Sequence, residues 1–286
     1  MFTIEKNKKI EYLQSPLLKS CDFLTHAFCT RRGGSSEDDY ASLNLSFREG
    51  DNEYKVLQNW GRLSDAFGIP LENFLVLNQV HSDKIFVIKK YGKYFTSRDE
   101  LDYDAIVCNR ANLAICIKTA DCVPVFFVDK IKKIIAVAHA GWRGTAQGIS
   151  SKIVHFLLSK YNCRPQDILT AIGPAIGRCC YQVDSPVAAE MKNHSNCDSF
   201  LFPCANAKNK WMLDLPEANR QQIIAAGIPE ENIETAGLCT RCRQDLFFSH
   251  RATGMFTGRQ INFLMIKETE PCIVVTLNNS RWKEQQ

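Results

Sequence analysis

Two residues able to bind a transition metal, Cys122 and His139, flank a stretch of the sequence with the pattern of a β-hairpin. Val123–Asp129 is apolar and rich in β-branched or aromatic residues, which is typical of a strand. The lysine-rich Lys130–Lys133 is a plausible turn, and Ile134–Ala138 predicts the second strand. This connection favours antiparallel pairing, because a parallel crossover needs about a dozen residues or more.

The predicted hairpin brings the cysteine and the histidine to matching ends of its two strands. With the turn centred near Ile131, Val123 faces His139, and Cys122 lies one residue from that pair. Neighbouring side chains across such a ladder lie about 5 Å apart, within reach of one metal ion. The same proximity also suits a metal-free chemistry, in which Cys122 is a nucleophile and His139 its general base. The spacing alone leaves both hypotheses open.

A third metal ligand is expected at His81, which lies at a polar break between two apolar runs, LVLNQV and IFVI. Taken alone, a histidine there is more often a surface or hydrogen-bonding residue, so His81 gains weight only from the Cys122 and His139 pair. Two imidazoles and one thiolate leave the fourth position of a zinc ion open, as in catalytic zinc sites. Zinc held in this way lowers the pKa of a bound water toward about 7. The same donors also suit copper.

The composition limits the class of protein that can carry this site. The chain has 286 residues, of which 45% are hydrophobic and 23% charged, as in soluble globular proteins. Its net charge of +4 is small and its basic residues are dispersed, which argues against a nucleic-acid partner. No apolar run is long enough to span a membrane, and the N-terminus MFTIEKNKKIEYL lacks the apolar core of a signal peptide. We therefore expect no membrane association and a cytoplasmic location.

The chain contains 13 cysteines, without the dense framework of a small secreted domain, which favours reduced thiols. Cys108, Cys116 and Cys272 lie in apolar runs and are expected to be small core residues. Cys239 and Cys242 have the spacing of half a zinc knuckle. Because no second half with the same spacing occurs, the sequence disfavours a structural metal there.

Helices and strands that position these residues are predicted from hydrophobic periodicity and caps. Helical spacing covers Asp51–Phe67 and Asp214–Ala226, and a third helix is predicted to begin with Thr145 as its N-cap. This third helix would begin beside the proposed metal and offer free backbone N–H groups to an anion such as phosphate. A last strand is predicted in IVVTLNN. No repeat or linker divides the sequence, so we expect a single domain over residues 1–286.

Five segments of the sequence resemble the signature blocks of a known family: NQVHSDKI, KTADCVPVFFVD, AVAHAGWRGT, GPAIGRCCYQV and FFSHRATGMFTGRQ. They are similar to those of the laccase-domain, or polyphenol-oxidase-like (YfiH-type), family, described as zinc-dependent purine nucleoside phosphorylases. Some bacterial members are called peptidoglycan editing factors. The resemblance runs from about His26 to Phe263, and it places the family's metal ligands on His81, Cys122 and His139.

The resemblance implies an α/β (α+β) fold in which mixed β-sheets pack in a sandwich with helices on the outer faces. It implies Zn²⁺ as cofactor and purine nucleosides and phosphate as partners. The implied activities are phosphorolysis of adenosine, inosine, guanosine and methylthioadenosine, and deamination of adenosine. Two alternatives use the same His-Cys-His site, namely a peptidoglycan-precursor editing hydrolase and a copper-dependent polyphenol oxidase. A multicopper oxidase is excluded because it needs many histidines, and the chain has six, with no closely spaced pair.

Four residues are candidates for substrate contacts: Arg31, Asn44, Arg143 and Arg251. Guanidinium groups match the geometry of oxyanions, so the three arginines are predicted to contact phosphate or substrate. Asn44 is predicted to hydrogen-bond a base or a ribose. For each of the four, a structural hydrogen bond between loops is the alternative. Gln182 stands where many family members carry glutamate, so an acid–base role is not carried over to it.

Overall fold

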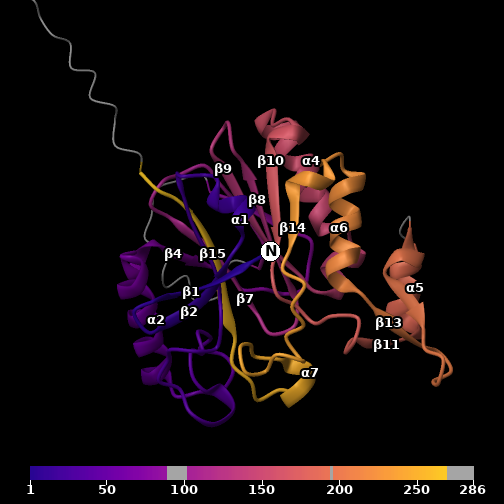
Figure 1. The fold of residues 1–286 in the computed structure, drawn as a ribbon, viewed down its shortest axis with the longest axis horizontal. Helices are drawn as coiled ribbons and strands as arrows, with labels where there is room; N and C mark the ends of the chain where they lie inside the picture. The colour runs from indigo at the N-terminus through magenta and orange to yellow at the C-terminus, as the bar shows by residue number, and fades with distance from the viewer. Residues whose placement is uncertain (89–101, 194–195, 269–286) are drawn as a thin grey trace, which may run out of the picture.

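Two six-stranded mixed β-sheets pack face to face, and helices cover the outer face of each sheet (Figure 1). The computed structural model describes residues 1–88, 102–193 and 196–268. The predicted α/β (α+β) sandwich of mixed sheets with outer helices is therefore confirmed. The extent of a single domain over residues 1–286 stays a prediction.

The first sheet carries β4 parallel to β7, and its other neighbouring strands are antiparallel. Its strand order is β1 (Thr3–Asn7), β2 (Ile10–Gln14), β3 (Leu24–Cys29), β15 (Gln260–Ile266), β7 (Ala114–Thr119) and β4 (Phe74–Val76). The strand β15 lies inside this sheet, although the sequence pattern had not indicated a strand there. The predicted strand IVVTLNN and the predicted core residue Cys272 lie outside the described residues.

The second sheet has a parallel pair at each edge and antiparallel pairs between them. Its order is β14 (Ile233–Thr235), β10 (Ile168–Ile172), β8 (Val123–Asp129), β9 (Ile134–Ala140), β6 (Ala105–Cys108) and β5 (Ile85–Val87). A third, smaller sheet has the order β11 (Gln182–Asp184), β13 (Lys210–Leu213) and β12 (Leu201–Pro203).

The predicted hairpin is confirmed as β8 and β9, with a register one residue from the expected one. His139 pairs with Pro124, and Val123 pairs with Ala140. The reason lies in the turn, where the Asp129 side chain accepts hydrogen bonds from the backbone N–H groups of Ile131 at 2.9 Å and Lys132 at 2.8 Å. Such a side-chain turn fixes where the strands reverse, which apolar spacing does not reveal.

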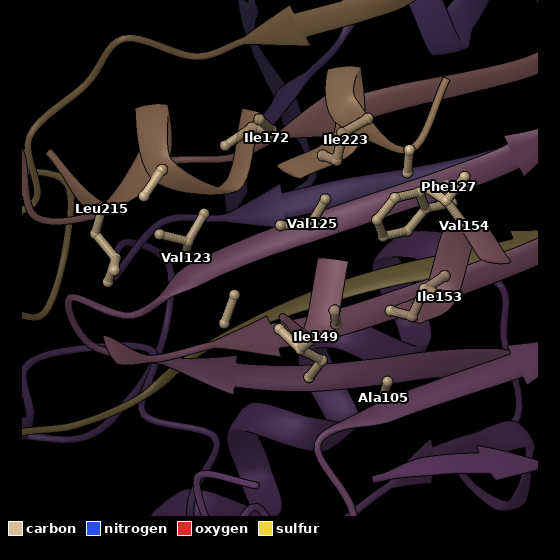
Figure 2. Packing of buried hydrophobic residues seen from close by; sticks show 14 of the residues in the cluster. Ala105, Val123, Val125, Phe127, Ile149, Ile153, Val154, Ile172, Leu215 and Ile223 are labelled. Atoms are coloured by element: carbon tan, nitrogen blue, oxygen red, sulfur yellow. The ribbon is translucent and has the colours of Figure 1, made fainter. Parts of the chain in front are cut away.

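Alternate side chains of β8 enter different layers of the core. Val125 and Phe127 pack against helices, whereas Phe126 and Val128 face the first sheet. This alternation is the two-residue period of a strand. Because both faces of β8 are covered, Val123–Val128 contains no polar side chain. Figure 2 shows the helix-facing cluster, where side chains of two helices meet those of the second sheet.

The helices agree with the predicted amphipathic segments except around Thr145. They are α1 (Pro16–Lys19), α2 (Glu53–Phe67), α3 (Trp142–Ala146), α4 (Ile149–Tyr161), α5 (Ser185–Lys192), α6 (Leu215–Ala225) and α7 (His250–Thr253). Single-turn 3₁₀ helices lie at Asp38–Tyr40, Leu71–Asn73, Pro165–Asp167, Cys197–Ser199 and Glu230–Asn232. In Figure 1, α2 lies on one side of the sheets and α4 and α6 on the other. None of the helices in the described ranges is long and apolar enough to cross a membrane.

The prediction that Thr145 is the N-cap of one long helix is wrong. Thr145 lies inside the short helix α3, and its hydroxyl accepts a hydrogen bond from Asn219 at 3.0 Å. The long helix α4 has Gly148 as its N-cap, with a φ of 80°. The left-handed conformation of Gly148 separates α3 from α4, and glycine adopts that conformation at little cost. The helix that begins beside the three donors is therefore the short α3, whose N-cap is Gly141, and not the long helix expected after Thr145.

The burial of His26 makes the stability of the fold depend on pH. His26 on β3 is 1% exposed, and its Nε2 accepts a hydrogen bond from the backbone N–H of Ser15 at 3.0 Å. Burial, and secondarily the charge of Lys19, lowers the pKa of His26 to about 4, although Glu234 opposes this shift. The folded state therefore binds a proton less readily than the unfolded chain, whose histidine pKa is about 6.5.

We predict that the free energy of unfolding falls as the pH drops from about 6.5 toward about 4, because the unfolded state takes up the proton first. Between about pH 7 and about pH 5, this term amounts to about 2 kcal/mol. Urea denaturation of His26→Gln should show a smaller acid destabilisation than the unaltered protein by that amount. The exposed His155 on α4 supplies the control variant His155→Gln. Equal pH dependence in all three proteins would contradict the prediction.

Candidate metal centre and substrate cavity

The three predicted metal ligands, His81, Cys122 and His139, converge at the open end of the β8–β9 hairpin in the second sheet. Their potential ligand atoms all lie within 4.8 Å of one another. His139 is on β9, Cys122 immediately precedes β8, and His81 lies in the segment between β4 and β5. The two imidazole rings are tilted by 68° at a centroid distance of 4.8 Å. The fold therefore places three suitable donors within reach of one ion.

The convergence of these donors requires a residue without a side chain at position 141. A Cβ at Gly141 would lie 2.6 Å from His81 Nδ1 and 3.2 Å from Cys122 Sγ. The first approach is closer than real Cβ contacts allow and the second is tight, so an alanine here would displace the His81 imidazole. One thiolate and two imidazoles also form a donor set that zinc accepts, with one coordination position left for water or substrate. Both the space and the chemistry fit a catalytic zinc ion.

A buried carboxylate, Asp104, orients two of the three donors, and the sequence analysis had not identified it. Asp104 is fully buried, and its Oδ1 accepts a hydrogen bond from His139 Nδ1 at 2.8 Å. This bond leaves the Nε2 of His139 as the nitrogen available to a metal. The same carboxylate accepts hydrogen bonds from the backbone N–H groups of His81 at 3.1 Å and Ser82 at 2.6 Å.

The segment that carries His81 is held in an uncommon backbone conformation by these bonds. His81 has a φ of 59°, in the left-handed region that favours glycine. Such a residue costs about 1–3 kcal/mol unless its surroundings determine the conformation. Three consecutive N–H groups, those of Val80, His81 and Ser82, donate to Asp104. The carboxylate therefore determines where the His81 imidazole lies.

The two imidazoles differ in their affinity for a proton. Burial, together with the neighbouring His139, lowers the pKa of His81 to about 4, so this imidazole is neutral near neutral pH. Although burial alone would lower the pKa of His139, its interactions with Cys122 and Asp104 raise it to about 9. Metal binding would therefore displace a proton from His139. A histidine beside a cysteine is also what the cysteine-nucleophile hypothesis requires, so that hypothesis stays open.

A cavity of about 460 Å³ opens over the three donors. This volume lies within the range of about 300–1,000 Å³ that is usual for small-molecule sites. Four arginines line the cavity together with the metal ligands: Arg48, Arg143, Arg251 and Arg259. Two aromatic residues, Trp142 and Tyr181, also line the cavity. The cavity thus combines a candidate metal, positive charge and flat apolar surfaces.

Arg143 and Arg251, two of the four predicted substrate contacts, line this cavity. The Arg143 guanidinium lies 4.4 Å from the centroid of the Trp142 ring. The Arg251 guanidinium lies 4.9 Å from the Tyr181 ring and donates a hydrogen bond to the carbonyl of Gln182 at 2.9 Å. Stacking on a ring fixes the plane of a guanidinium while leaving N–H groups for an oxyanion.

Arg31 and Asn44 are not among the residues that line the cavity. Arg31 donates to the backbone carbonyls of Ala41 at 2.6 Å and Gln244 at 3.2 Å. Asn44 is fully buried, and its Oδ1 accepts a hydrogen bond from the backbone N–H of Arg259 at 2.9 Å. Their substrate contacts stay predictions, and these bonds favour the structural alternative for both residues. Asn44 contacts the backbone of the cavity-lining Arg259 and is also bonded to Ser46, which contacts Arg48 and Glu49.

Arg48 and Arg259 were missed in the sequence because neither lies near the metal ligands along the chain. Arg259 forms an ion pair with Glu49 at 2.7 Å, and Arg48 donates a hydrogen bond to Asn78. Arg48 lies in a polar segment, and Arg259 lies in the last signature block, where nothing in the sequence distinguishes it as a cavity residue. The fold alone brings them to the cavity.

The described histidines do not form the several copper sites of a multicopper oxidase. Among the described residues, His81 and His139 are the two histidines found in a cluster of three or more potential metal ligands. His26 is bonded to Ser15 within the first sheet, and His155 is exposed on α4. The geometry therefore offers one mononuclear histidine-containing site.

The chain matches known proteins over most of its length. The family model described as "Multi-copper polyphenol oxidoreductase laccase" matches residues 25–267. The purine nucleoside phosphorylase YlmD of Geobacillus stearothermophilus is 37% identical over 243 residues, covering 84% of this chain and 89% of the relative. A protein named adenosine deaminase RL5, from an unknown prokaryotic organism, is 34% identical over 240 residues, covering 82% of this chain and 90% of the relative.

The fold is also similar to solved structures. The crystal structure of the hypothetical protein YfiH from Bacillus licheniformis superimposes with a TM-score of 0.86 at 33% identity. The match covers 93% of this chain and 99% of that structure.

We predict that Asp104→Asn weakens zinc binding by about 10- to 100-fold, the usual cost of removing a partner of a metal-binding histidine. An amide cannot accept hydrogen bonds at both of its atoms, so the orientation of His139 and the His81 backbone is loosened. Titration with zinc against a competing chelator measures the affinity. Asp129→Asn, which removes a buried carboxylate at the other end of the same hairpin, should lower stability but leave zinc affinity unchanged. Equal affinity in Asp104→Asn would contradict this role.

We predict that His81→Ala weakens zinc binding by more than about 100-fold, since loss of a ligand costs more than loss of its supporting partner. The melting transition should remain largely intact, because His81 lies outside the hairpin and the sheets. The matched control is His250→Ala, which removes another histidine that lines the cavity. If His81→Ala retained full affinity and His250→Ala lost it, His250 would be the third ligand.

Proposed function

Because the chain belongs to the multi-copper polyphenol oxidoreductase laccase family, whose relatives include named purine nucleoside phosphorylases, we propose that it is a zinc-dependent purine nucleoside phosphorylase. The proposed substrates are adenosine, inosine, guanosine and methylthioadenosine, with phosphate as the second substrate. Adenosine deaminase activity in the same site is part of the proposal, and a relative is named for that activity.

The observation that carries this proposal is that the three metal donors and four arginines line one cavity. Phosphorolysis of a nucleoside needs a bound oxyanion on one side of the ribose and stabilisation of the departing purine on the other. Arginine side chains suit the first task, because each presents N–H groups in the geometry of a phosphate oxygen pair. The cavity volume of about 460 Å³ accommodates both reactants together.

We assign phosphate binding to Arg143 and Arg251, with Arg48 and Arg259 as further contributors. Arg251 is oriented by the Tyr181 ring and the Gln182 carbonyl. Arg143 lies two residues after Gly141, which makes room for His81, so its backbone lies near the metal ligands. These positions favour an oxyanion that lies between the arginines and the donors.

The aromatic side chains Trp142 and Tyr181 are assigned to the purine ring. Each already carries a guanidinium on one face, and both line the cavity. A flat base fits such surfaces by stacking. Burial raises the pKa of the Tyr181 hydroxyl far above its ordinary range. Tyr181 therefore keeps its proton and can act as a hydrogen-bond donor.

A zinc ion held by the three donors would supply a Lewis acid and a site for activating water, which serves deamination as well as polarisation of a substrate. The protein's own part is to hold the donors. Asp104 keeps the proton of His139 on Nδ1, and Gly141 leaves room for the His81 ring. With the carboxylate on Nδ1, the Nε2 of His139 would be the nitrogen that binds the ion.

Two other activities would use the same donors, namely hydrolysis of misbuilt peptidoglycan precursors and copper-dependent oxidation of phenols. The four arginines that line the cavity favour the nucleoside reaction over phenol oxidation, which needs no anion site. One set of assays separates all three. It measures phosphate-dependent release of free base, hydrolysis of muramyl peptides, and oxygen uptake with a phenol.

We predict that the zinc-loaded protein releases purine base only when phosphate is present, and that Cys122→Ser abolishes both release and zinc binding at the His-Cys-His site. A neutral hydroxyl replaces neither the charge nor the softness of a thiolate ligand. Zinc content by mass spectrometry and base release by chromatography are measured on the same samples. Cys197→Ser, a half-buried cysteine outside the site, is the matched control and should retain both.

The results distinguish the remaining hypotheses. If Cys122→Ser kept stoichiometric zinc at the site but lost turnover, Cys122 would be a nucleophile and not a ligand. If the unaltered protein released no base from any of the four nucleosides yet hydrolysed muramyl peptides, the proposed function would be wrong.

A further inference from the structure

A second cluster of potential metal ligands, separate from the His-Cys-His site, consists of four cysteines. They are Cys179, Cys180, Cys239 and Cys242, and their sulfur atoms all lie within 4.8 Å of one another. The first two follow β10 in the segment that leads to β11, and the other two lie between β14 and α7. The fold thus joins two segments that are distant along the chain.

The distances between these sulfur atoms resemble those of a metal-bound set. Cys242 Sγ lies 3.4 Å from Cys180 Sγ and 3.6 Å from Cys179 Sγ. A disulfide requires about 2.05 Å. Four thiolates around zinc, each about 2.3 Å from the ion, are separated by about 3.8 Å along the edges of a tetrahedron. The observed spacing is therefore near that of a tetrathiolate site.

Polar groups around the cluster suit negatively charged sulfur atoms. The backbone N–H of Gly177 donates a hydrogen bond to Cys239 Sγ at 3.3 Å, and the guanidinium of Arg241 donates to Cys180 Sγ at 3.5 Å. Donors of this kind stabilise thiolate ligands and are usual partners of a metal site. The positive charge of Arg241 also offsets part of the net charge of four thiolates around a divalent ion.

The backbone beside the cluster leaves room for four converging sulfur atoms. A Cβ at Gly177 would lie 3.3 Å from Cys239 Cβ and 3.5 Å from Cys179 Sγ. The first distance is tight and the second is an ordinary van der Waals contact, so a side chain at position 177 would press on Cys239 and touch Cys179. The segment Gly177–Cys180 also forms a turn, with the N–H of Cys180 bonded to the carbonyl of Gly177 at 3.0 Å.

We propose that Cys179, Cys180, Cys239 and Cys242 bind one Zn²⁺ ion in a closed, four-thiolate site that fastens together two walls of the substrate cavity. Four protein ligands leave no open position, so this zinc is structural and not catalytic. Cys239 and Cys242 have the spacing of half a zinc knuckle, whereas the other half of this site is the adjacent pair Cys179 and Cys180.

The cysteine cluster is connected to the cavity by short contacts. Thr240, between two of the ligands, donates its hydroxyl hydrogen to Asp121 Oδ1 at 2.6 Å. The other oxygen of Asp121 accepts from the backbone N–H of Arg251, also at 2.6 Å. On the other segment, Cys180 is followed directly by Tyr181, which lines the cavity. A metal in the cluster would therefore restrict the positions of both Arg251 and Tyr181.

The first experiment counts zinc in protein that cannot use the catalytic site. Purified Cys122→Ser is expected to retain one zinc per chain, whereas the unaltered protein holds two. X-ray absorption of zinc in the variant should show four sulfur neighbours at about 2.3 Å and no nitrogen neighbours. Absence of zinc in the variant together with a single zinc in the unaltered protein would overturn the proposal.

The second experiment removes one ligand of the cluster while the catalytic site stays complete. Cys242 is exposed, so Cys242→Ser should fold and should lose one of the two zinc ions, with the His-Cys-His zinc retained. Cys197→Ser, outside the cluster, should retain both ions. We also expect a KM for phosphate at least several-fold higher in Cys242→Ser, because Arg251 is less restrained, with a smaller change in kcat.

Mass spectrometry of unreduced, alkylated protein supplies the remaining outcome. After zinc removal, all four cysteines of the cluster are expected to be alkylated. A disulfide between two of them in freshly purified protein would overturn the proposal. Because this inference depends on zinc counts and sulfur neighbours, it can fail while nucleoside phosphorolysis is observed, and it can hold if phosphorolysis is not.

Discussion

The carboxylate of Asp104 is the interaction on which the geometry of the candidate site depends. It is fully buried, and it accepts hydrogen bonds from the His139 ring, the Ser82 hydroxyl and three consecutive backbone N–H groups. A buried charge without such partners would be costly, and here each donor also fixes an element of the site. Asp104 precedes β6, which lies between β9 and β5 in the second sheet. The carboxylate therefore joins a strand that carries one ligand to a loop that carries another.

The sandwich explains how these few bonds can be held in place. The hairpin of β8 and β9 lies in the middle of the second sheet, with the first sheet on one face and helices on the other. Every residue of both strands is buried. Motion of Cys122 or His139 would disturb a closely packed core, whose packing resists such displacement. The ligand from the loop, His81, lacks that support and relies on Asp104 instead.

The two clusters of sulfur and nitrogen donors differ in a way that matches their surroundings. The His-Cys-His set has three donors and faces a cavity lined by arginines, whereas the four cysteines face one another and include exposed members. Asp121 connects them, since it precedes Cys122 and binds both Thr240 and the backbone of Arg251. Open coordination beside anion-binding side chains suits chemistry, and closed coordination between two loops suits structure.

The sequence by itself determined the features that depend on residues near one another along the chain. The hairpin, the reduced buried cysteines Cys108 and Cys116, and the amphipathic helix α2 follow from two-residue and 3.6-residue periodicity and from caps. The Cys122 and His139 pair was found for the same reason, because one short turn joins their strands. Even there the register was one residue off, since it depends on hydrogen bonds to the Asp129 side chain.

Only the tertiary structure decided which distant residues share a site. The role of Asp104, the convergence of Cys179 and Cys180 with Cys239 and Cys242, and the placement of Arg259 all depend on packing between segments far apart in sequence. Arg31 has the same chemistry as Arg251, but the fold commits it to backbone carbonyls outside the cavity. The residue type determines what a side chain can bind. Which partners it meets depends on how the sheets and loops pack, because local hydrogen bonding carries no information about contacts across the core.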